Sequence, residues 1–158
     1  MPVKIRTMKS SDKDEIMAIL RSTPAFVAED VAIAEEVIDA YLGDPRESGY
    51  HFYVAEDEGH VVAYISYGAT PLTRGTWDIY WLATAPNQRG KGIGSTLLKF
   101  AEADIKNGGG RMVLIETAAN PTYELARRLY QTHGYEIIST VPDFYDPGDA
   151  KLTFRKYL

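Results

Sequence analysis

The chain has 158 residues, of which 45% are hydrophobic and 25% charged, a composition typical of one globular domain with a sizeable core. It has no cysteine, and its three histidines fall in no metal-ligand spacing, so disulfides, thiolate chemistry and a metal site are not expected. A formal net charge of −5 argues against general nucleic-acid binding, and no apolar run approaches the ~20 residues of a membrane span, so we expect a cytoplasmic protein with a single domain over residues 1–158.

The first part of the chain predicts one strand followed by two helices. Residues 3–8 alternate apolar and polar side chains, as a half-exposed strand does. Ser11 and Asp14 have the spacing of a helix start, and an apolar stripe follows them. A second amphipathic pattern predicts a helix over residues 30–42, which the turn at 43–45 ends.

Acidic side chains are concentrated in one region of the sequence. Residues 29–58 contain ten acidic side chains and a single basic one, Arg46. Such a run can be a solvated helix face followed by a turn. It can also form a negative surface that attracts cationic acceptors such as amines, and the two interpretations are compatible.

The middle of the chain predicts three strands, a glycine-rich turn and a helix. Residues 50–56 and 61–69 are rich in aromatic and β-branched side chains and are separated by a short turn, which indicates a hairpin. Residues 77–84 form the expected central strand, and the helix after the glycine-rich turn should end near Asn107. The continuous apolar run 112–115 is typical of a strand buried on both faces, so it should lie beside the central strand.

The last part predicts one more helix and a final antiparallel pair. Asn120 and Pro121 have the residue types of a helix cap and first turn. The packing face of this helix is expected to comprise Leu125, Ala126 and Leu129. Residues 135–141 and 150–157 are the expected strands, with an aromatic, turn-rich link between them. The predicted order is β-α-α-β-β-β-α-β-α-β-β, an α/β domain of mixed α+β type with about seven strands and four helices.

The glycine-rich turn, residues 88–95, has the sequence QRGKGIGS. Alternate glycines let a ligand approach the backbone closely, because no Cβ intervenes. The helix start adds free N–H groups and a positive dipole end, which favour phosphate, and Arg89 and Lys91 add positive charge. The spacing excludes a Walker loop, and Ser95 or Leu97 stands where a dinucleotide fingerprint needs its third glycine. The turn therefore predicts an anion site of another kind.

Two segments of the chain resemble the GCN5-related N-acetyltransferase (GNAT) superfamily. Residues 89–94 are similar to its Arg/Gln-x-x-Gly-x-Gly/Ala loop, which holds the diphosphate of acetyl-coenzyme A. Residues 120–135, NPTYELARRLYQTHGY, are similar to its Asn…Ala-x-x-Leu-Tyr-x-x-x-Gly-Phe/Tyr segment. The element order is also similar, over about residues 3–158. In two departures, Thr84 replaces an aliphatic residue, and two additional residues before the last helix change the register of Asn120.

The resemblance implies an N-acetyltransferase domain whose sheet is splayed between the fourth and fifth strands. Acetyl-coenzyme A would be the acyl donor, without a metal, and a small-molecule or peptide amine would attack the thioester directly in a ternary complex. The central strand would bulge near Leu82 and expose backbone N–H groups to the acetyl and pantetheine parts. The coenzyme-binding residues that the resemblance implies are Leu82, Ala83, Thr84, Gln88, Arg89, Gly90, Lys91, Gly92, Ile93, Gly94, Ser95, Asn120 and Tyr130.

The resemblance also implies catalytic residues. Tyr130 matches a tyrosine near the coenzyme sulfur, and a phenol pKa of ~10 keeps it protonated as a general acid. Asp78 and Glu116 match acidic residues of two branches of the superfamily, and each is a candidate general base, alone or through water. Strand parity decides which face each carboxylate occupies.

The sequence leaves the acceptor open. Four tyrosines are candidates to line a pocket for an amine with an apolar body: Tyr50, Tyr67, Tyr80 and Tyr145. Unpaired strand edges also permit a homodimer. The alternative function is a non-catalytic acyl-coenzyme A sensor or partner-binding module, which would need none of the three catalytic residues, so their presence together favours the enzyme.

Overall fold

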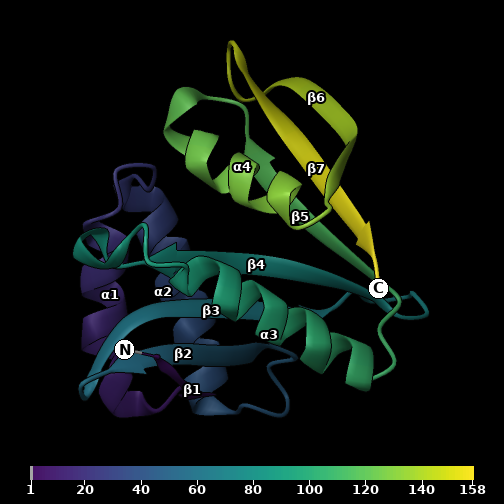
Figure 1. The fold of residues 1–158 in the computed structure, drawn as a ribbon. Coiled ribbons are helices and arrows are strands. Elements are labelled where there is room, and N and C mark those ends of the chain that lie inside the picture. Colours follow the sequence, from purple (N-terminus) through teal and green to yellow (C-terminus); the bar gives the residue numbers. More distant parts are fainter. Residues whose placement is uncertain (1) are drawn as a thin grey trace.

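The computed structural model describes residues 2–158, which form seven strands and four α-helices in the predicted order (Figure 1). The strands are β1 (Lys4–Thr7), β2 (His51–Asp57), β3 (His60–Ala69), β4 (Thr76–Thr84), β5 (Met112–Ala118), β6 (Glu136–Asp146) and β7 (Asp149–Tyr157). The helices are α1 (Lys13–Arg21), α2 (Ala28–Gly43), α3 (Ile93–Asn107) and α4 (Glu124–Thr132), and the short 3₁₀ turns are η1 (Ser10–Asp12), η2 (Pro86–Gln88) and η3 (Pro121–Tyr123). None of the described helices combines the length and apolar character needed to cross a bilayer.

The strands form one mixed sheet in the order β1-β2-β3-β4-β5-β7-β6. β4 and β5 are parallel neighbours, and the other pairs are antiparallel. The prediction that the apolar run 112–115 lies beside the central strand is therefore confirmed. A parallel pair needs a crossover, and α3 supplies it between β4 and β5.

The sheet splits between β4 and β5, as predicted. Pairing between these strands covers only Thr76–Ile79 of β4 and Met112–Ile115 of β5, and beyond it they diverge (Figure 1). We call this opening the fork. The N-terminal arm comprises β1–β4 with α1–α3, and the C-terminal arm comprises β5–β7 with α4.

The bulge in β4 lies at Tyr80, two residues before the position expected near Leu82. Ser66 of β3 pairs with Trp81 and Tyr67 pairs with Ile79, so Tyr80 is the additional residue. Such an insertion reverses the alternation of side chains beyond it. Accordingly Ile79 packs in the core on one face of the sheet, whereas Trp81 packs in the core on the other.

Each face of the sheet has its own core. On the α3–α4 face, Leu97 and Ile105 of α3 and Tyr130 of α4 pack on Ile79 and Phe154 of the sheet. On the α1–α2 face, Ile16 and Leu20 of α1 and Ile38 of α2 pack on Phe52 of β2 and Tyr64 of β3. Burying this much apolar surface on both faces stabilises the domain while the fork stays open.

Two details of the C-terminal arm differ from the sequence prediction. Leu125 was expected on the packing face of α4, but it is 70% exposed, and Tyr130 is the most deeply buried residue of that helix. The link after residue 141 is strand rather than loop, because β6 continues to Asp146 and pairs with Asp149 across a tight turn. Aromatic residues favour this extension, and Pro142 is tolerated because β6 is an edge strand.

Candidate active site

The glycine loop, residues 88–95, connects η2 to α3 at the open end of the fork. Gly92 precedes the first residue of α3 with φ 78°, and Gly90 has φ 79°, a left-handed conformation that side chains other than glycine rarely adopt. A Cβ added at either glycine would meet no atom within 4 Å. The backbone of the loop therefore faces open space, where a ligand can approach it.

The backbone N–H groups of this loop are available for a ligand. Within residues 2–158, the amides from Arg89 to Ser95 donate to no backbone or side-chain acceptor. The positive end of the α3 dipole adds to their attraction for an anion. The Lys91 side chain also lies at the loop, where its Nζ donates to Gln88 Oε1 at 3.1 Å, and the Arg89 side chain is exposed. Backbone and side chains together form an anion site.

A strand edge adjoins the glycine loop. Residues 81–84 of β4 pair with β3 on one side but with no strand of the described chain on the side of the fork. The Ala85 amide donates to Val62 of β3, so the backbone groups of Leu82 and Thr84, which alternate with it, face the fork unpaired. An extended ligand could pair with them. Gly94 lies close to the end of β4 and to α4, because a Cβ there would be 3.9 Å from Thr84 and 3.5 Å from Leu129.

Tyr130 of α4 lies in the C-terminal arm and is buried in the core, with only 7% of the residue exposed. Its ring packs 5.6 Å from Phe154 and 6.2 Å from Tyr135 between centroids. Burial raises the pKa of Tyr130 to about 12, with a smaller contribution from Tyr123. No group of residues 2–158 accepts a hydrogen bond from its hydroxyl, so the O–H stays protonated at neutral pH and is free to donate.

A hydrogen bond fastens α4 to the glycine loop. The C-cap residue of α4 is His133, and its Nε2 lies 2.9 Å from Ser95 Oγ. Burial lowers the pKa of His133, so the neutral imidazole is favoured there. This contact fixes the helix that carries Tyr130 against the helix start that carries the free amides.

The two candidate bases occupy different positions relative to the fork. Both lie on the α1–α2 face, because they alternate with core residues of the α3–α4 face. Asp78 lies in the closed part of the sheet opposite Leu114, and its Oδ2 accepts a hydrogen bond of 2.6 Å from Thr70 Oγ1. Glu116 lies one residue beyond the last β4–β5 pair, with 58% of its side chain exposed and Lys151 Nζ at 4.0 Å. Only Glu116 is at the opening.

The side chain of Asn120 is occupied by contacts within the protein. Its Oδ1 accepts a 3.0 Å hydrogen bond from the Thr122 amide and caps η3. Its Nδ2 donates to Asp149 Oδ2 at 2.9 Å, and Asp149 also accepts from the amides of Ala119 and Asn120. Sequence reasoning did not single out Asp149, because the turn that carries it meets this segment only in the folded chain.

The four tyrosines considered for the acceptor pocket do not lie together. Tyr67 is fully buried on the α3–α4 face and donates to Asp104 Oδ2 at 2.5 Å, so the expectation for Tyr67 is wrong. Tyr50 and Tyr80 lie on the α1–α2 face with their rings edge to face at 5.5 Å. Tyr145 is half-exposed on β6. The alternation of β3 places Tyr67 away from the others.

Comparison with known proteins identifies a family and a relative of this chain. Residues 48–137 match the family described as the acetyltransferase (GNAT) domain. An uncharacterized N-acetyltransferase of Methanocaldococcus jannaschii is 36% identical over 107 residues, which span 66% of this chain and 65% of that protein. The aligned region thus spans just under two thirds of that relative's length.

Solved structures are also similar. The crystal structure of an acetyltransferase described as of the GNAT family, from Desulfovibrio desulfuricans, superposes with a TM-score of 0.94 at 33% identity, covering 98% of each chain. An aminoglycoside 6'-N-acetyltransferase complexed with coenzyme A superposes with a TM-score of 0.77 at 17% identity, covering 98% of this chain and 96% of that one. The second likeness concerns the fold alone.

Proposed function

Since this chain belongs to the GNAT acetyltransferase family, we propose that it transfers an acetyl group directly from acetyl-coenzyme A to a primary amine. The family is one of acetyl-coenzyme A-dependent acyltransferases, and one structural neighbour is complexed with coenzyme A. The observation that carries the proposal is the row of unpaired amides from Arg89 to Ser95 beside the unpaired edge of β4.

The residues of the fork fit such a donor. The amides of the glycine loop, with Gln88, Arg89 and Lys91, would hold the diphosphate. The free edge at Leu82 and Thr84, on either side of Ala83, would pair with the amides of the pantetheine arm and receive the acetyl oxygen. Asn120 acts here by orienting η3 and the Asp149 turn, since its amide group is already used.

Acetyl-coenzyme A supplies the activated acyl group, which gains a carbon–nitrogen bond to the amine as its carbon–sulfur bond breaks. A primary amine is mostly protonated at neutral pH, so a base must accept one proton before or during the attack. Glu116 is the better placed carboxylate, because it lies at the opening, whereas Asp78 accepts from Thr70 in the closed sheet. Either a direct contact or a water molecule would carry the proton to Glu116.

The leaving sulfur needs a proton or a strong hydrogen bond. Tyr130 has a protonated hydroxyl with no other acceptor in the described chain, so it can donate to the sulfur and regain a proton from water afterwards.

Amine-dependent thiol release from acetyl-coenzyme A tests this proposal, with the acetylated amine identified by mass spectrometry. We expect release with at least one primary amine, and its loss in Tyr130→Phe while coenzyme A still binds. Tight coenzyme binding without turnover of any amine would instead indicate a sensor. Equal rates for the wild-type protein and Tyr130→Phe would remove Tyr130 from the chemistry.

A further inference from the structure

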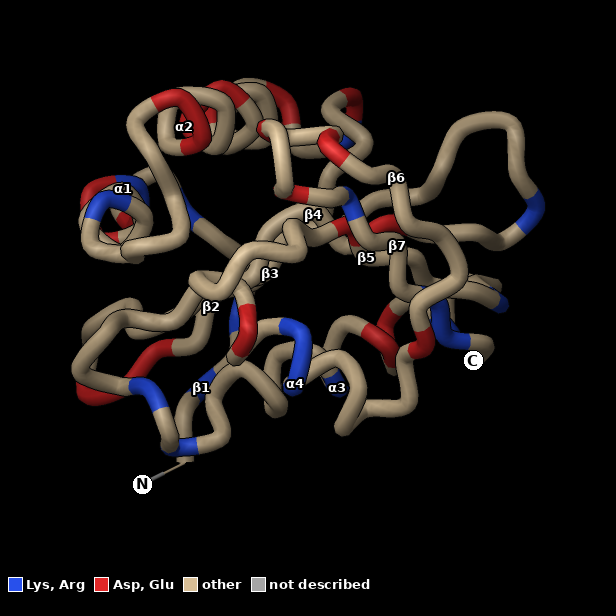
Figure 2. Tube along the Cα trace, turned by 90° about the horizontal axis from the view of Figure 1, so that it is seen from above, with Lys and Arg blue, Asp and Glu red and all other residues tan. Residues whose placement is uncertain are grey.

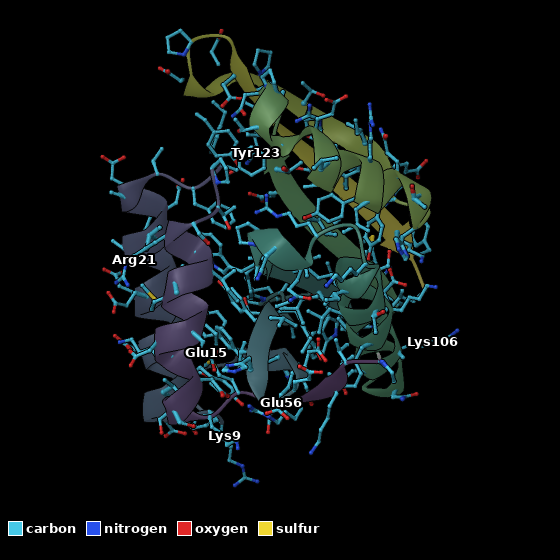
Figure 3. The ribbon with its side chains drawn as sticks, turned by 60° about the vertical axis from the view of Figure 1, so that its left-hand side comes forward. Lys9, Glu15, Arg21, Glu56, Lys106 and Tyr123 are labelled. Carbon is cyan, nitrogen blue, oxygen red and sulfur yellow. The ribbon has the colours of Figure 1, made fainter. Side chains whose placement is uncertain are left out.

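Aromatic side chains of both arms meet across the fork on the α1–α2 face. Phe26, between α1 and α2, packs edge to face on Trp81 of β4 with centroids 5.4 Å apart, and lies 6.5 Å from Tyr123 of η3. The Tyr123 hydroxyl donates to the carbonyl of Ala25 at 3.3 Å. Tyr123 thus lies between the C-terminal arm and the α1–α2 segment (Figure 3). We call Phe26, Trp81 and Tyr123 the aromatic bridge.

A second aromatic pair, on β6, extends the aromatic bridge, and we call all five rings the aromatic surface. Phe144 and Tyr145 pack edge to face at 4.9 Å, yet 52% and 48% of them remain exposed, respectively. Both belong to neither core of the sheet. Exposed rings beside a reaction site are available to pack against an apolar ligand.

The charges around these rings are mainly negative. Burial, followed by the charges of Glu116, Asp149 and Asp30, raises the pKa of Tyr145. Burial, followed by Asp30, Tyr145 and Asp149, raises the pKa of Tyr123 to about 12.

Two further observations describe the charge on this face. Lys151 lies close by, but its Nζ is engaged 4.3 Å from the Phe144 ring and 4.0 Å from Glu116. Acidic residues also line α2, which begins next to Phe26 (Figure 2). The negative potential on the α1–α2 face would raise the local concentration of a cation there.

The aromatic surface reaches the reaction centre. Tyr123 directly precedes α4, the helix that carries Tyr130, and it contributes to the raised pKa of Tyr130. Lys151 Nζ lies 4.0 Å from Glu116 and 4.3 Å from the Phe144 ring, on which Tyr145 packs, so the aromatic pair of β6 lies beside Glu116. A molecule resting on these rings would therefore hold its amine close to both residues that the proposed chemistry uses.

We infer that the acceptor is a small cationic amine with a flat aromatic body and no carboxylate, bound between the aromatic bridge and Tyr145. This inference rests on the proposed function and adds its substrate class. The rings provide stacking and cation–π contacts, and Asp30 and Asp149 attract the ammonium before Glu116 deprotonates it. An acceptor with its own carboxylate would be repelled by all three acids.

Three matched amines test the substrate class through kcat/KM at saturating acetyl-coenzyme A: 2-phenylethylamine, its saturated analogue 2-cyclohexylethylamine, and phenylalanine, which adds a carboxylate. We expect 2-phenylethylamine to exceed phenylalanine by at least about tenfold, from charge repulsion. It should exceed the saturated amine by about threefold, the size of exposed aromatic contacts.

Two variants locate the effect. Asp30→Asn keeps an oxygen that can accept from the Val27 amide, which Asp30 now caps at 3.0 Å, and removes only the charge. We expect Asp30→Asn to lower the ratio of kcat/KM for 2-phenylethylamine to kcat/KM for phenylalanine about threefold. Tyr145→Leu should abolish the preference for the aromatic ring over the saturated one. Tyr157→Leu is the control, because Tyr157 is also an exposed ring but lies at the other end of β7.

The outcomes separate the two proposals. If phenylalanine or the saturated amine is acetylated as well as 2-phenylethylamine, or if Tyr157→Leu acts like Tyr145→Leu, the substrate inference is wrong and the proposed function stands. If none of the three amines is acetylated although another primary amine is, the substrate inference is wrong and the proposed function stands; if coenzyme A binds and no primary amine is acetylated, both are wrong. The expected ranking, with both variant effects and an unchanged coenzyme affinity, supports both.

Discussion

The glycine loop and the aromatic surface are built in different ways. The glycine loop is one continuous segment, and its binding groups are backbone amides that depend on two glycines and a helix start. The aromatic surface takes its side chains from the α1–α2 segment, β4, η3 and β6, which lie far apart in the sequence. A backbone site can be recognised from a short motif, whereas a side-chain site exists only in the assembled fold.

The two sides also differ in charge. The glycine loop combines Arg89, Lys91 and a helix N-terminus, so it attracts anions. The aromatic surface has Asp30, Glu116 and Asp149 nearby, so it attracts cations. An anionic donor and a cationic acceptor would each be drawn to its own side, which favours a productive ternary complex over exchange of the two sites.

The largest expected effect comes from adding a charge to the loop. Gly92→Glu would place a carboxylate where the diphosphate is expected and should weaken coenzyme A binding about 100-fold or more, measured by calorimetry. Gly59→Glu is the matched control, since Gly59 also has a left-handed φ of 81° and no neighbour within 4 Å. It should cost similar stability and leave affinity unchanged. Unaltered binding in Gly92→Glu would remove the diphosphate from the loop.

Removing the Tyr130 hydroxyl should affect the reaction rather than binding. Tyr130→Phe is expected to lower kcat about 100-fold with little change in coenzyme KM, because general acids contribute at about this level. Since burial raises the pKa of Tyr130 to about 12, the phenol stays protonated through the usual assay range. The wild-type kcat should therefore show no alkaline decline from this group below about pH 11. A decline near pH 9 that Tyr130→Phe abolishes would contradict this assignment.

The two carboxylates should respond differently to neutralisation. Glu116→Gln should lower kcat/KM about tenfold or more at neutral pH, with the loss shrinking as the pH is raised and more amine is already neutral. Asp78→Asn should change kcat/KM little, because Asp78 lies in the closed sheet and accepts from Thr70. Stopped assays over a pH series compare them. The reverse order of effects would assign the base to Asp78.

The smallest expected effect concerns the contact that joins the arms across the aromatic surface. Tyr123→Phe removes a single 3.3 Å hydrogen bond to Ala25 and keeps the ring packed near Phe26. We expect the acceptor KM to rise about threefold with unchanged coenzyme affinity, since one such bond contributes on the order of 1 kcal/mol. Initial rates at varied amine concentration measure this. An effect on coenzyme affinity alone would place Tyr123 on the donor side.

Much of the fold could be predicted from local patterns. Periodicity located α3, and the apolar run 112–115 located the inner strand, because both signals come from burial against neighbours. The exposure of Leu125 was missed, since an apolar residue on an amphipathic helix does not reveal how far the neighbouring sheet extends. Tyr67 was placed on the wrong face for a similar reason, as aromatic content alone does not show strand parity.

The site was predictable to the extent that it is local. The left-handed glycines and the helix start follow from the motif itself. The bulge at Tyr80 does not, because it depends on the pairing of β4 with β3. Phe26, Tyr123 and Asp149 carry no sequence signal for their role, since their contacts span long separations along the chain.

The position of β7 has a consequence for the order in which the protein matures. β7 lies between β5 and β6, so β6 leaves the ribosome before the strand that attaches it to the sheet. Pairing of such distant segments is slow relative to local structure. Tyr145 belongs to this hairpin, which joins the sheet last. We therefore expect the folding chain to form the site for the acetyl donor before the site for the amine acceptor. Pulsed hydrogen exchange during refolding should then find β6 protected no earlier than β7.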